Sequence, residues 1–158
     1  MKKHTINDLI FFQHRDTEGT ENLYPNVMNE EAYNQLSGQI INACISVHRE
    51  LGPGLLESVY EACLVKELQQ RGLTVKSQIQ LPVIYKGEVL DKHFTMDLVV
   101  QDAIVVELKA VETILPVHEV QLVTYLKLSG MKLGLLVNFN VPILKNGLRR
   151  RINGNLNE

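Results

Sequence analysis

Three charged residues, Asp97, Glu107 and Lys109, interrupt two otherwise apolar stretches of the sequence. The turn-forming pair Gln101-Asp102 separates these stretches, which predicts two adjacent strands of a buried sheet. Burying two carboxylates and an ammonium group costs free energy unless the charges are paired or bound to a metal ion. We therefore infer that these three side chains serve a function.

Alternation along a strand predicts the face of the sheet on which each side chain lies, because successive side chains point to opposite faces. Glu107 and Lys109 are expected to share a face with Val105 and Val111. On the preceding strand, Asp97 is expected to lie opposite a row of four apolar residues, namely Phe94, Met96, Leu98 and Val100. Each strand would then carry charge on a face that also carries apolar side chains.

Asp97, Glu107 and Lys109 have the chemistry to hydrolyse a phosphodiester bond. Carboxylate oxygens at close quarters bind Mg²⁺ or Mn²⁺, hard cations that keep several waters and bridge to phosphate oxygens. A neighbouring ammonium can orient or deprotonate a metal-bound water and stabilise the charge that develops on the phosphorus. Without metal, the same side chains could form a buried ion-pair network, which stabilises a fold only with good geometry. The Glu-x-Lys triplet alone is a weak signal, and its position inside an apolar strand gives it weight.

A predicted helix over residues 116–129 carries further polar groups. Gln121 and Tyr125 lie four residues apart and share a helix face, and His118 precedes them on the same side. A helix docked on the sheet could present these groups to the same site. The alternatives are a core aromatic residue at Tyr125 and a surface histidine in the first turn at His118.

The remaining elements follow from hydrophobic periodicity and from residues that end helices. Helices are expected over residues 30–51 and 55–71, with Gly52-Pro53-Gly54 between them. Strands are expected over four ranges, namely residues 75–85, 89–100, 103–111 and 132–139. The order α-α-β-β-β-α-β indicates an α/β fold with a small mixed sheet flanked by helices.

Glu57 falls in the first turn of the second predicted helix, next to its apolar side. A carboxylate at this place complements the helix dipole and stabilises the helix by up to about 1 kcal/mol. This purely structural role is the alternative to a role of Glu57 in the site.

The length of 158 residues fits one domain, with 45% hydrophobic and 22% charged residues. We expect a poorly ordered extension over residues 1–28, a domain over residues 29–152 and a frayed tail over residues 153–158. The formal net charge of −2 argues against a protein that coats nucleic acid electrostatically. A local basic groove is still compatible with that total, and Arg149-Arg150-Arg151 is the only dense basic cluster.

We expect a cytoplasmic protein with no membrane partner. No apolar run approaches the roughly 18 residues of a transmembrane helix, and the apolar segment near the start is too short for a secretory signal. Cys44 and Cys63 are expected on apolar helix faces as small hydrophobic residues rather than as a disulfide. Two cysteines cannot supply an iron–sulfur cluster or the usual structural zinc site.

The stretch Gly54-Leu55-Leu56-Glu57-Ser58-Val59-Tyr60 resembles the Gly-x-x-Glu-x-x-Tyr signature of the GxxExxY family, a branch of the PD-(D/E)XK nuclease superfamily. The resemblance extends through residues 47–54, 105–110 and 117–121 and covers residues 28–152. It implies a restriction-endonuclease-like core.

The resemblance also implies a role for each candidate residue. As metal ligands it implies Glu57, Asp97, Glu107 and, through its carbonyl oxygen, Leu108. Lys109 would be the catalytic lysine. Gln121 and Tyr125 would match the Gln-x-x-x-Tyr motif of RecB-like nucleases.

The leading hypothesis is a Mg²⁺- or Mn²⁺-dependent nuclease that acts on nucleic acid, with DNA as the expected substrate. The alternatives are a catalytically silent nuclease-fold module that binds protein or nucleic acid, and a purely structural ion-pair network. A homodimer or a protein partner is compatible with either function, because a small nuclease domain often needs help to hold its substrate. The choice between DNA and RNA, the type of cut and the roles of His48 and His118 stay open at the level of sequence.

Overall fold

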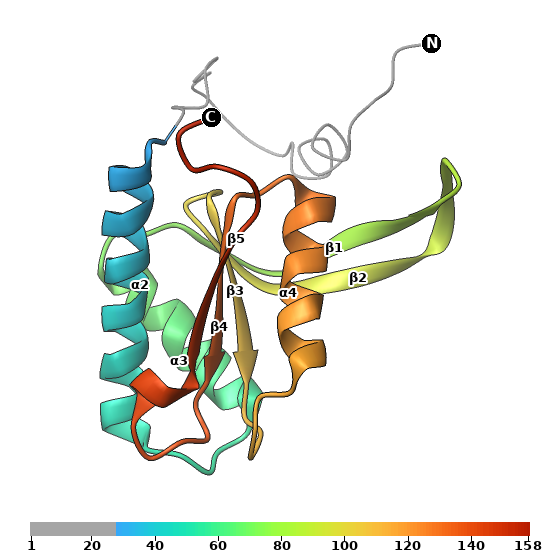
Figure 1. Ribbon diagram of the computed structural model, residues 1–158. Helices are drawn as coiled ribbons and strands as arrows, with labels where there is room; N and C mark the ends of the chain where they lie inside the picture. The colour runs from blue at the N-terminus through green and yellow to red at the C-terminus, as the bar shows by residue number, and fades with distance from the viewer. Residues whose placement is uncertain (1–27) are drawn as a thin grey trace.

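A five-stranded β-sheet with helices on both faces forms the centre of the computed structural model, which describes residues 28–158 (Figure 1). The predicted extension over residues 1–28 lies outside the described residues except for Met28. The helices are α2 (Glu30–Leu51), α3 (Glu57–Gln70), α4 (Pro116–Ser129) and the short 3-10 helix η1 (Leu144–Gly147). The strands are β1 (Val75–Tyr85), β2 (Glu88–Val100), β3 (Ile104–Lys109), β4 (Leu133–Asn138) and β5 (Leu148–Ile152).

The strand order across the sheet is β1-β2-β3-β4-β5. All neighbouring strands are antiparallel except β3 and β4, which are parallel and are joined through α4. The predicted α/β fold with a small mixed sheet flanked by helices is thereby confirmed. The expected order lacked β5, because this short strand is dominated by three arginines and shows no apolar alternation.

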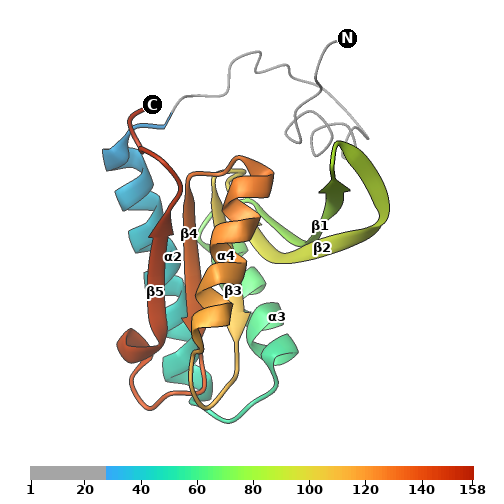
Figure 2. The same ribbon diagram turned by 45° about the vertical axis from the view of Figure 1, so that its right-hand side comes forward.

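Two apolar clusters fill the spaces between the sheet and its helices. On one face α2 and α3 pack against side chains such as Leu98, Val106 and Leu108. On the other face α4 packs against side chains such as Val105 and Leu136, and Figure 2 shows α4 standing in front of the sheet. The close approach of α4 requires Gly134 on β4, because a Cβ atom there would lie 2.7 Å from a methyl group of Leu122.

α2 and α4 begin and end where the sequence predicts, whereas α3 covers Glu57–Gln70 rather than the expected residues 55–71. The side chain of Asn29 accepts a hydrogen bond from the Ala32 N–H (2.9 Å) and caps the start of α2. Gly52, with φ of 68°, ends that helix. Pro116 opens α4, and Gly130, with φ of 73°, closes it, as expected.

The alternation of side chains along β2 breaks at Asp97. Met96 packs in the cluster under α4, whereas Leu98 packs in the cluster under α2 and α3. The prediction that Phe94, Met96, Leu98 and Val100 form one face is therefore wrong. The break has a counterpart on the neighbouring strand β1, where Gln78 has a left-handed φ of 53°.

The β1–β2 hairpin projects beyond the rest of the sheet as a two-stranded arm (Figure 1). Its turn is Lys86-Gly87, and both residues have positive φ. The register of the two strands shifts between Pro82 and Ile84, because Pro82 has no N–H to donate to the partner strand. Large apolar side chains near the tip, such as Tyr85 and Val89, are exposed.

Residues 153–158, expected to be a frayed tail, pack against the domain. Leu156 is buried in the cluster beneath α2, and the N–H of Asn153 donates to the carbonyl of Lys132 (2.8 Å). Asn and Gly dominate this segment, and its single apolar anchor gives no periodic signal.

Cys44 is buried and Cys63 is half-buried, and both are free thiols. No helix of residues 28–158 has the length and the apolar character that crossing a membrane requires.

Candidate active site

The carboxylates of Asp97 and Glu107 meet where β2 and β3 separate. The paired register of the two strands ends at Leu98 and Val106. One step further along, the Asp97 N–H donates to Oε1 of Glu107 (2.9 Å), and the Leu108 N–H donates to Oδ2 of Asp97 (2.9 Å). The two carboxylates thus accept hydrogen bonds that backbone carbonyls accept elsewhere in the sheet. This exchange fixes both acids against the opposite strand.

The electrostatics of the site centre on Glu107, of which only 3% is exposed. Burial, followed by the negative charge of Asp97, raises the pKa of Glu107 to about 9. Hydrogen bonding from the Asp97 backbone and the positive charge of Lys109 act in the opposite direction. The pKa of Glu57 is also raised, by burial first and then by the charge of Asp97. In the metal-free protein Glu107 therefore keeps its proton at neutral pH.

The side of the site next to α4 consists of Lys109 on β3 and of Gln121 and Tyr125 on α4. The Nζ atom of Lys109 donates to Oε1 of Gln121 (3.3 Å). Burial, followed by the charges of Glu107 and Asp97, raises the pKa of Tyr125, and the side chain of Gln121 acts in the opposite direction. The structure therefore brings both helix residues to the strand-borne charges. Tyr125 is buried and touches Phe94 of the arm, with ring centroids 5.9 Å apart.

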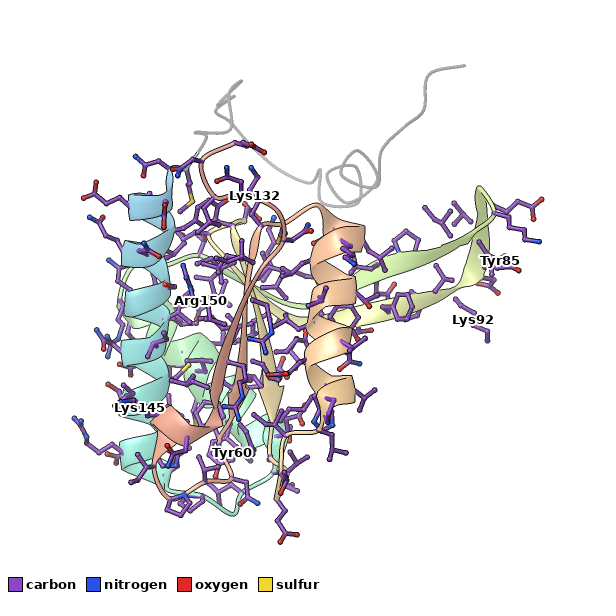
Figure 3. All side chains as sticks on the ribbon, in the orientation of Figure 1. Tyr60, Tyr85, Lys92, Lys132, Lys145 and Arg150 are labelled. Atoms are coloured by element: carbon purple, nitrogen blue, oxygen red, sulfur yellow. The ribbon has the colours of Figure 1, made fainter. Side chains whose placement is uncertain are left out.

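Glu57 reaches the neighbourhood of the site from the first turn of α3. The turn before it is held by Tyr60, a fully buried residue on the first turns of the same helix. The Tyr60 hydroxyl donates to the Gly52 carbonyl (2.5 Å) and accepts from the Leu55 N–H (3.2 Å). Tyr60 is labelled in Figure 3, near the end of the sheet where β3 and β4 finish.

A stacked aromatic pair connects this turn to Lys109. The ring of Tyr60 lies parallel to that of Phe139, with centroids 4.6 Å apart and an interplanar angle of 8°. The backbone N–H of Phe139 donates to the carbonyl of Lys109 (2.9 Å). Tyr60 and Phe139 therefore connect the turn before α3 to the backbone of Lys109.

Sequence reasoning assigned no role to Asn138, although it holds the chain that follows Lys109. Asn138 is buried, its amide donates to the Val111 carbonyl (2.8 Å), and its Oδ1 accepts from the Val111 N–H (3.1 Å). The sequence did contain a sign of this role, namely an amide side chain at the end of an apolar strand. A buried amide needs a hydrogen-bond partner for each of its polar atoms.

The two histidines whose roles stayed open have structural contacts. Nε2 of His48 lies 2.7 Å from the Val141 carbonyl and fastens the loop after β4 to α2. Nδ1 of His118 accepts from the Leu115 N–H (3.0 Å) and caps the start of α4. The expectation that His118 shares the face of Gln121 is therefore not matched by a contact with the site.

The donor atoms of the site are those that a hard divalent cation prefers, namely carboxylate and carbonyl oxygens. The charge of Asp97 raises the pKa of Glu107, and a cation bound between the two carboxylates would oppose that effect. Within residues 28–158, however, no three side chains of His, Cys, Asp or Glu gather closely enough to hold a metal ion. Glu57, Asp97 and Glu107 therefore do not lie close enough together to form the predicted three-carboxylate ligand set. Asp97 and Glu107 lie together and supply carboxylate oxygens, the donor type that such a cation binds.

A family model described as the PD-(D/E)XK nuclease superfamily matches residues 34–151, which is more than half of the chain. The matched range contains every candidate residue of the site. No curated protein and no solved structure is found that matches the chain.

Proposed function

Because the chain belongs to the PD-(D/E)XK nuclease superfamily, we propose that it is a metal-dependent nuclease that hydrolyses phosphodiester bonds in DNA. The observation that carries the proposal is the pair of strand-borne carboxylates, Asp97 and Glu107, locked to each other's strand with Lys109 beside them. Nucleic acid is the substrate class that the superfamily implies. DNA, rather than RNA, is part of the proposal.

Asp97, Glu107 and the Leu108 carbonyl would hold Mg²⁺ or Mn²⁺, the divalent ions that such oxygen donors bind. When bound, the ion supplies Lewis-acid polarisation of the phosphate and lowers the pKa of a coordinated water. Glu57 contributes through its charge, since its pKa responds to both Asp97 and Lys109.

Lys109 and its partners on α4 would act on the attacking water and on the phosphate. The ammonium group orients the water and stabilises negative charge that develops at the phosphorus. The hydrogen bond from Lys109 to Gln121 aims the lysine side chain, and Tyr125 lies on the same face of α4, four residues after Gln121. Preorganised groups of this kind lower the barrier because they need no reorganisation during the reaction.

We further propose that the chain belongs to the GxxExxY branch of the superfamily and shares the RecB-like motif set. The support is the motif Gly54-x-x-Glu57-x-x-Tyr60 together with the pair Gln121 and Tyr125. Two hydrogen bonds of the Tyr60 hydroxyl hold the turn that leads to Glu57, so the Tyr and the Glu of the motif are linked through this turn.

A cleavage assay tests the function. Labelled single-stranded, duplex and branched DNA, and the corresponding RNA, are incubated with Mg²⁺, with Mn²⁺ and with chelator. Asp97→Asn and Lys109→Met should each lower the cleavage rate by at least about 10²-fold while the protein stays folded. Asp102→Asn, on the exposed turn between β2 and β3, is the matched control and should cleave like the wild type.

Equal, nonzero cleavage by the wild type, Asp97→Asn and Lys109→Met would remove these residues from the mechanism. Calorimetric titration with Mg²⁺ and Mn²⁺ separates the nuclease from a silent module. A nuclease binds the ion and loses that binding in Asp97→Asn, whereas a silent module binds none in either protein.

A further inference from the structure

Positive charge is concentrated in the C-terminal part of this acidic chain. Residues 120–157 hold six of the 16 lysines and arginines but none of the 18 aspartates and glutamates. The formal net charge of −2 therefore conceals a basic region. Four of the six cations lie on the consecutive elements η1 and β5, and we call this set the basic edge: Lys145, Arg149, Arg150 and Arg151.

The basic edge occupies the side of the sheet opposite the arm. β5 is the last strand in the sheet order and β1 is the first. In Figure 3, Lys145 and Arg150 lie on the β5 side of the molecule, whereas Tyr85 and Lys92 mark the arm on the other side. The arm carries acids as well as lysines, so it does not form a second basic surface.

The register of the sheet places the basic edge near the active site. Glu107 pairs with Leu136, and Leu136 pairs with Arg149, so the three residues form one row across β3, β4 and β5. With strands about 4.8 Å apart, Arg149 lies about 10 Å from Glu107 along this row. Paired residues share a face of the sheet, so the Arg149 side chain emerges on the face that also carries Glu107. A nucleic-acid strand advances about 3.4 Å per phosphate, which makes the separation about three phosphates.

The charge of the basic edge is only partly compensated. Arg149 and Arg151 share a single carboxylate, that of Glu119 on α4, at 3.4 and 2.7 Å. Arg150 donates to the neutral side chain of Asn34 (2.6 Å). Lys145 is exposed and forms no ion pair with any described residue.

We propose that the basic edge binds backbone phosphates of the nucleic-acid substrate, outside the bond that is cut. Three guanidinium groups present planar pairs of donors that match phosphate oxygens. Arg149 and Arg151 lie beside the first turn of α4, so a strand that passes the start of that helix can reach both Lys109 and Arg149. Arg150 lies on the α2 side of the same edge strand. The inference rests on the proposed function in taking the same nucleic acid as ligand, but binding at the basic edge does not require cleavage.

The test measures binding separately from cleavage. A fluorescently labelled DNA duplex and a labelled single strand are titrated with full-length protein in chelator, by anisotropy, over a series of salt concentrations. The edge variant replaces all four basic residues by glutamine: K145Q, R149Q, R150Q and R151Q. The control variant removes the same charge from exposed lysines elsewhere: K66Q, K76Q, K86Q and K92Q.

Each phosphate contact contributes about 0.9 to the slope of log affinity against log salt concentration for duplex DNA. The edge variant should lower that slope by about three and weaken binding at least tenfold near physiological salt. The control variant should leave the slope within about one of the wild-type value. Urea unfolding verifies that both variants fold.

The variant Glu119→Gln should change the affinity for DNA in the opposite direction to the edge variant. Removing the shared carboxylate frees the guanidinium groups of Arg149 and Arg151, so binding should tighten severalfold. Equal losses in the edge and control variants, or no change of the slope in either, overturn the proposal. Preference of the basic edge for an acidic peptide over DNA overturns it as well. Binding that follows these expectations without any cleavage in metal supports the basic edge while it refutes the proposed nuclease.

Discussion

Glu107 is a buried acid whose ionised form is disfavoured, and its pKa is the most strongly affected property of the site. In the metal-free protein its pKa rises from the ordinary 4.5 to about 9, because of burial and then because of Asp97. The folded state therefore retains a proton that the unfolded chain releases above about pH 4.5. Stability falls as the pH rises from about 4.5 to about 9, since the folded state binds more protons throughout that window.

Replacing Glu107 by Gln should stabilise the metal-free protein. Gln resembles the protonated acid, since its oxygen can accept from the Asp97 N–H, and it is neutral in both states. At about pH 7 the gain should be of the order of 3 kcal/mol, and it should vanish near pH 4.5. Urea unfolding in chelator across this pH range measures the effect.

Glu112→Gln, at an exposed acid just beyond β3, is the control and should stay within about 0.5 kcal/mol of the wild type at every pH. A purely structural ion-pair network makes the reverse prediction. Loss of the Glu107 charge would then strand Lys109 and destabilise the protein by roughly 3–5 kcal/mol.

At the scale of residues, sequence reasoning located the site through charges that an apolar strand cannot ordinarily bury. Asp97 and Glu107 lie together through hydrogen bonds to each other's strand, and Lys109 donates to Gln121 of α4. The charges of Glu107 and Asp97 raise the pKa of Tyr125, which lies four residues further along α4. That these residues act as one site stays a prediction. The geometry between the acids was not accessible, because the exchange of hydrogen bonds with the opposite strand depends on where the β2–β3 register ends.

The elements differ in how clearly the sequence defines them. The ends of the helices have local causes, such as the stop at Gly52-Pro53-Gly54 after α2, and these were predictable. β5 and the packed C-terminal segment depend on partners distant in sequence: Arg149 pairs with Leu136, and Asn153 bonds the carbonyl of Lys132. The hydrophobic pattern of a short stretch of sequence does not reveal such long-range contacts. The break in alternation at Asp97 was missed for the same reason.

Tyr60 acts on the site through an element rather than by touching it. Its hydroxyl ties Gly52 to Leu55, so it sets the angle at which α3 presents Glu57. Tyr60→Phe keeps the stack on Phe139 and removes both hydrogen bonds. Stability should fall by about 1 kcal/mol, because Leu55 is exposed and water can replace the lost partner.

Cleavage by folded Tyr60→Phe should fall by about tenfold in kcat with KM nearly unchanged, because positioning of the reacting groups is affected rather than substrate binding. Tyr85→Phe, at the exposed tip of the arm, is the matched control and should alter neither quantity. A loss of stability with a wild-type kcat would assign Tyr60 a role in folding alone.

At the scale of the whole molecule, the sheet divides the protein into regions of different character. The arm extends from one edge, the basic edge lies at the other, and the acids and Lys109 lie between them on β2 and β3. The overall α/β order could be predicted because each helix and each of the first four strands has its own periodic signal. Whether two copies associate stays a prediction, and the exposed apolar side chains of the arm make it the first surface to examine.

Metal binding should couple the site to the stability of the entire domain. Asp97 and Glu107 must both be ionised to hold Mg²⁺ or Mn²⁺, so binding at about pH 7 displaces the proton of Glu107. Affinity should therefore rise by up to about tenfold per pH unit until the pH reaches about 9. An ion present at about a hundredfold excess over its Kd stabilises the folded state by about 2.7 kcal/mol. Stability lost between about pH 7 and pH 9 in chelator should be recovered in metal, and the difference between the two conditions should widen with pH.

Urea unfolding with and without each ion, at several pH values, measures this difference for the wild type and for Asp97→Asn. The variant should show no metal-dependent stabilisation at any pH, since one of the two carboxylates is gone. A stabilisation that is independent of pH, or that persists in Asp97→Asn, would place the ion elsewhere on the protein and would separate the buried proton of Glu107 from metal binding.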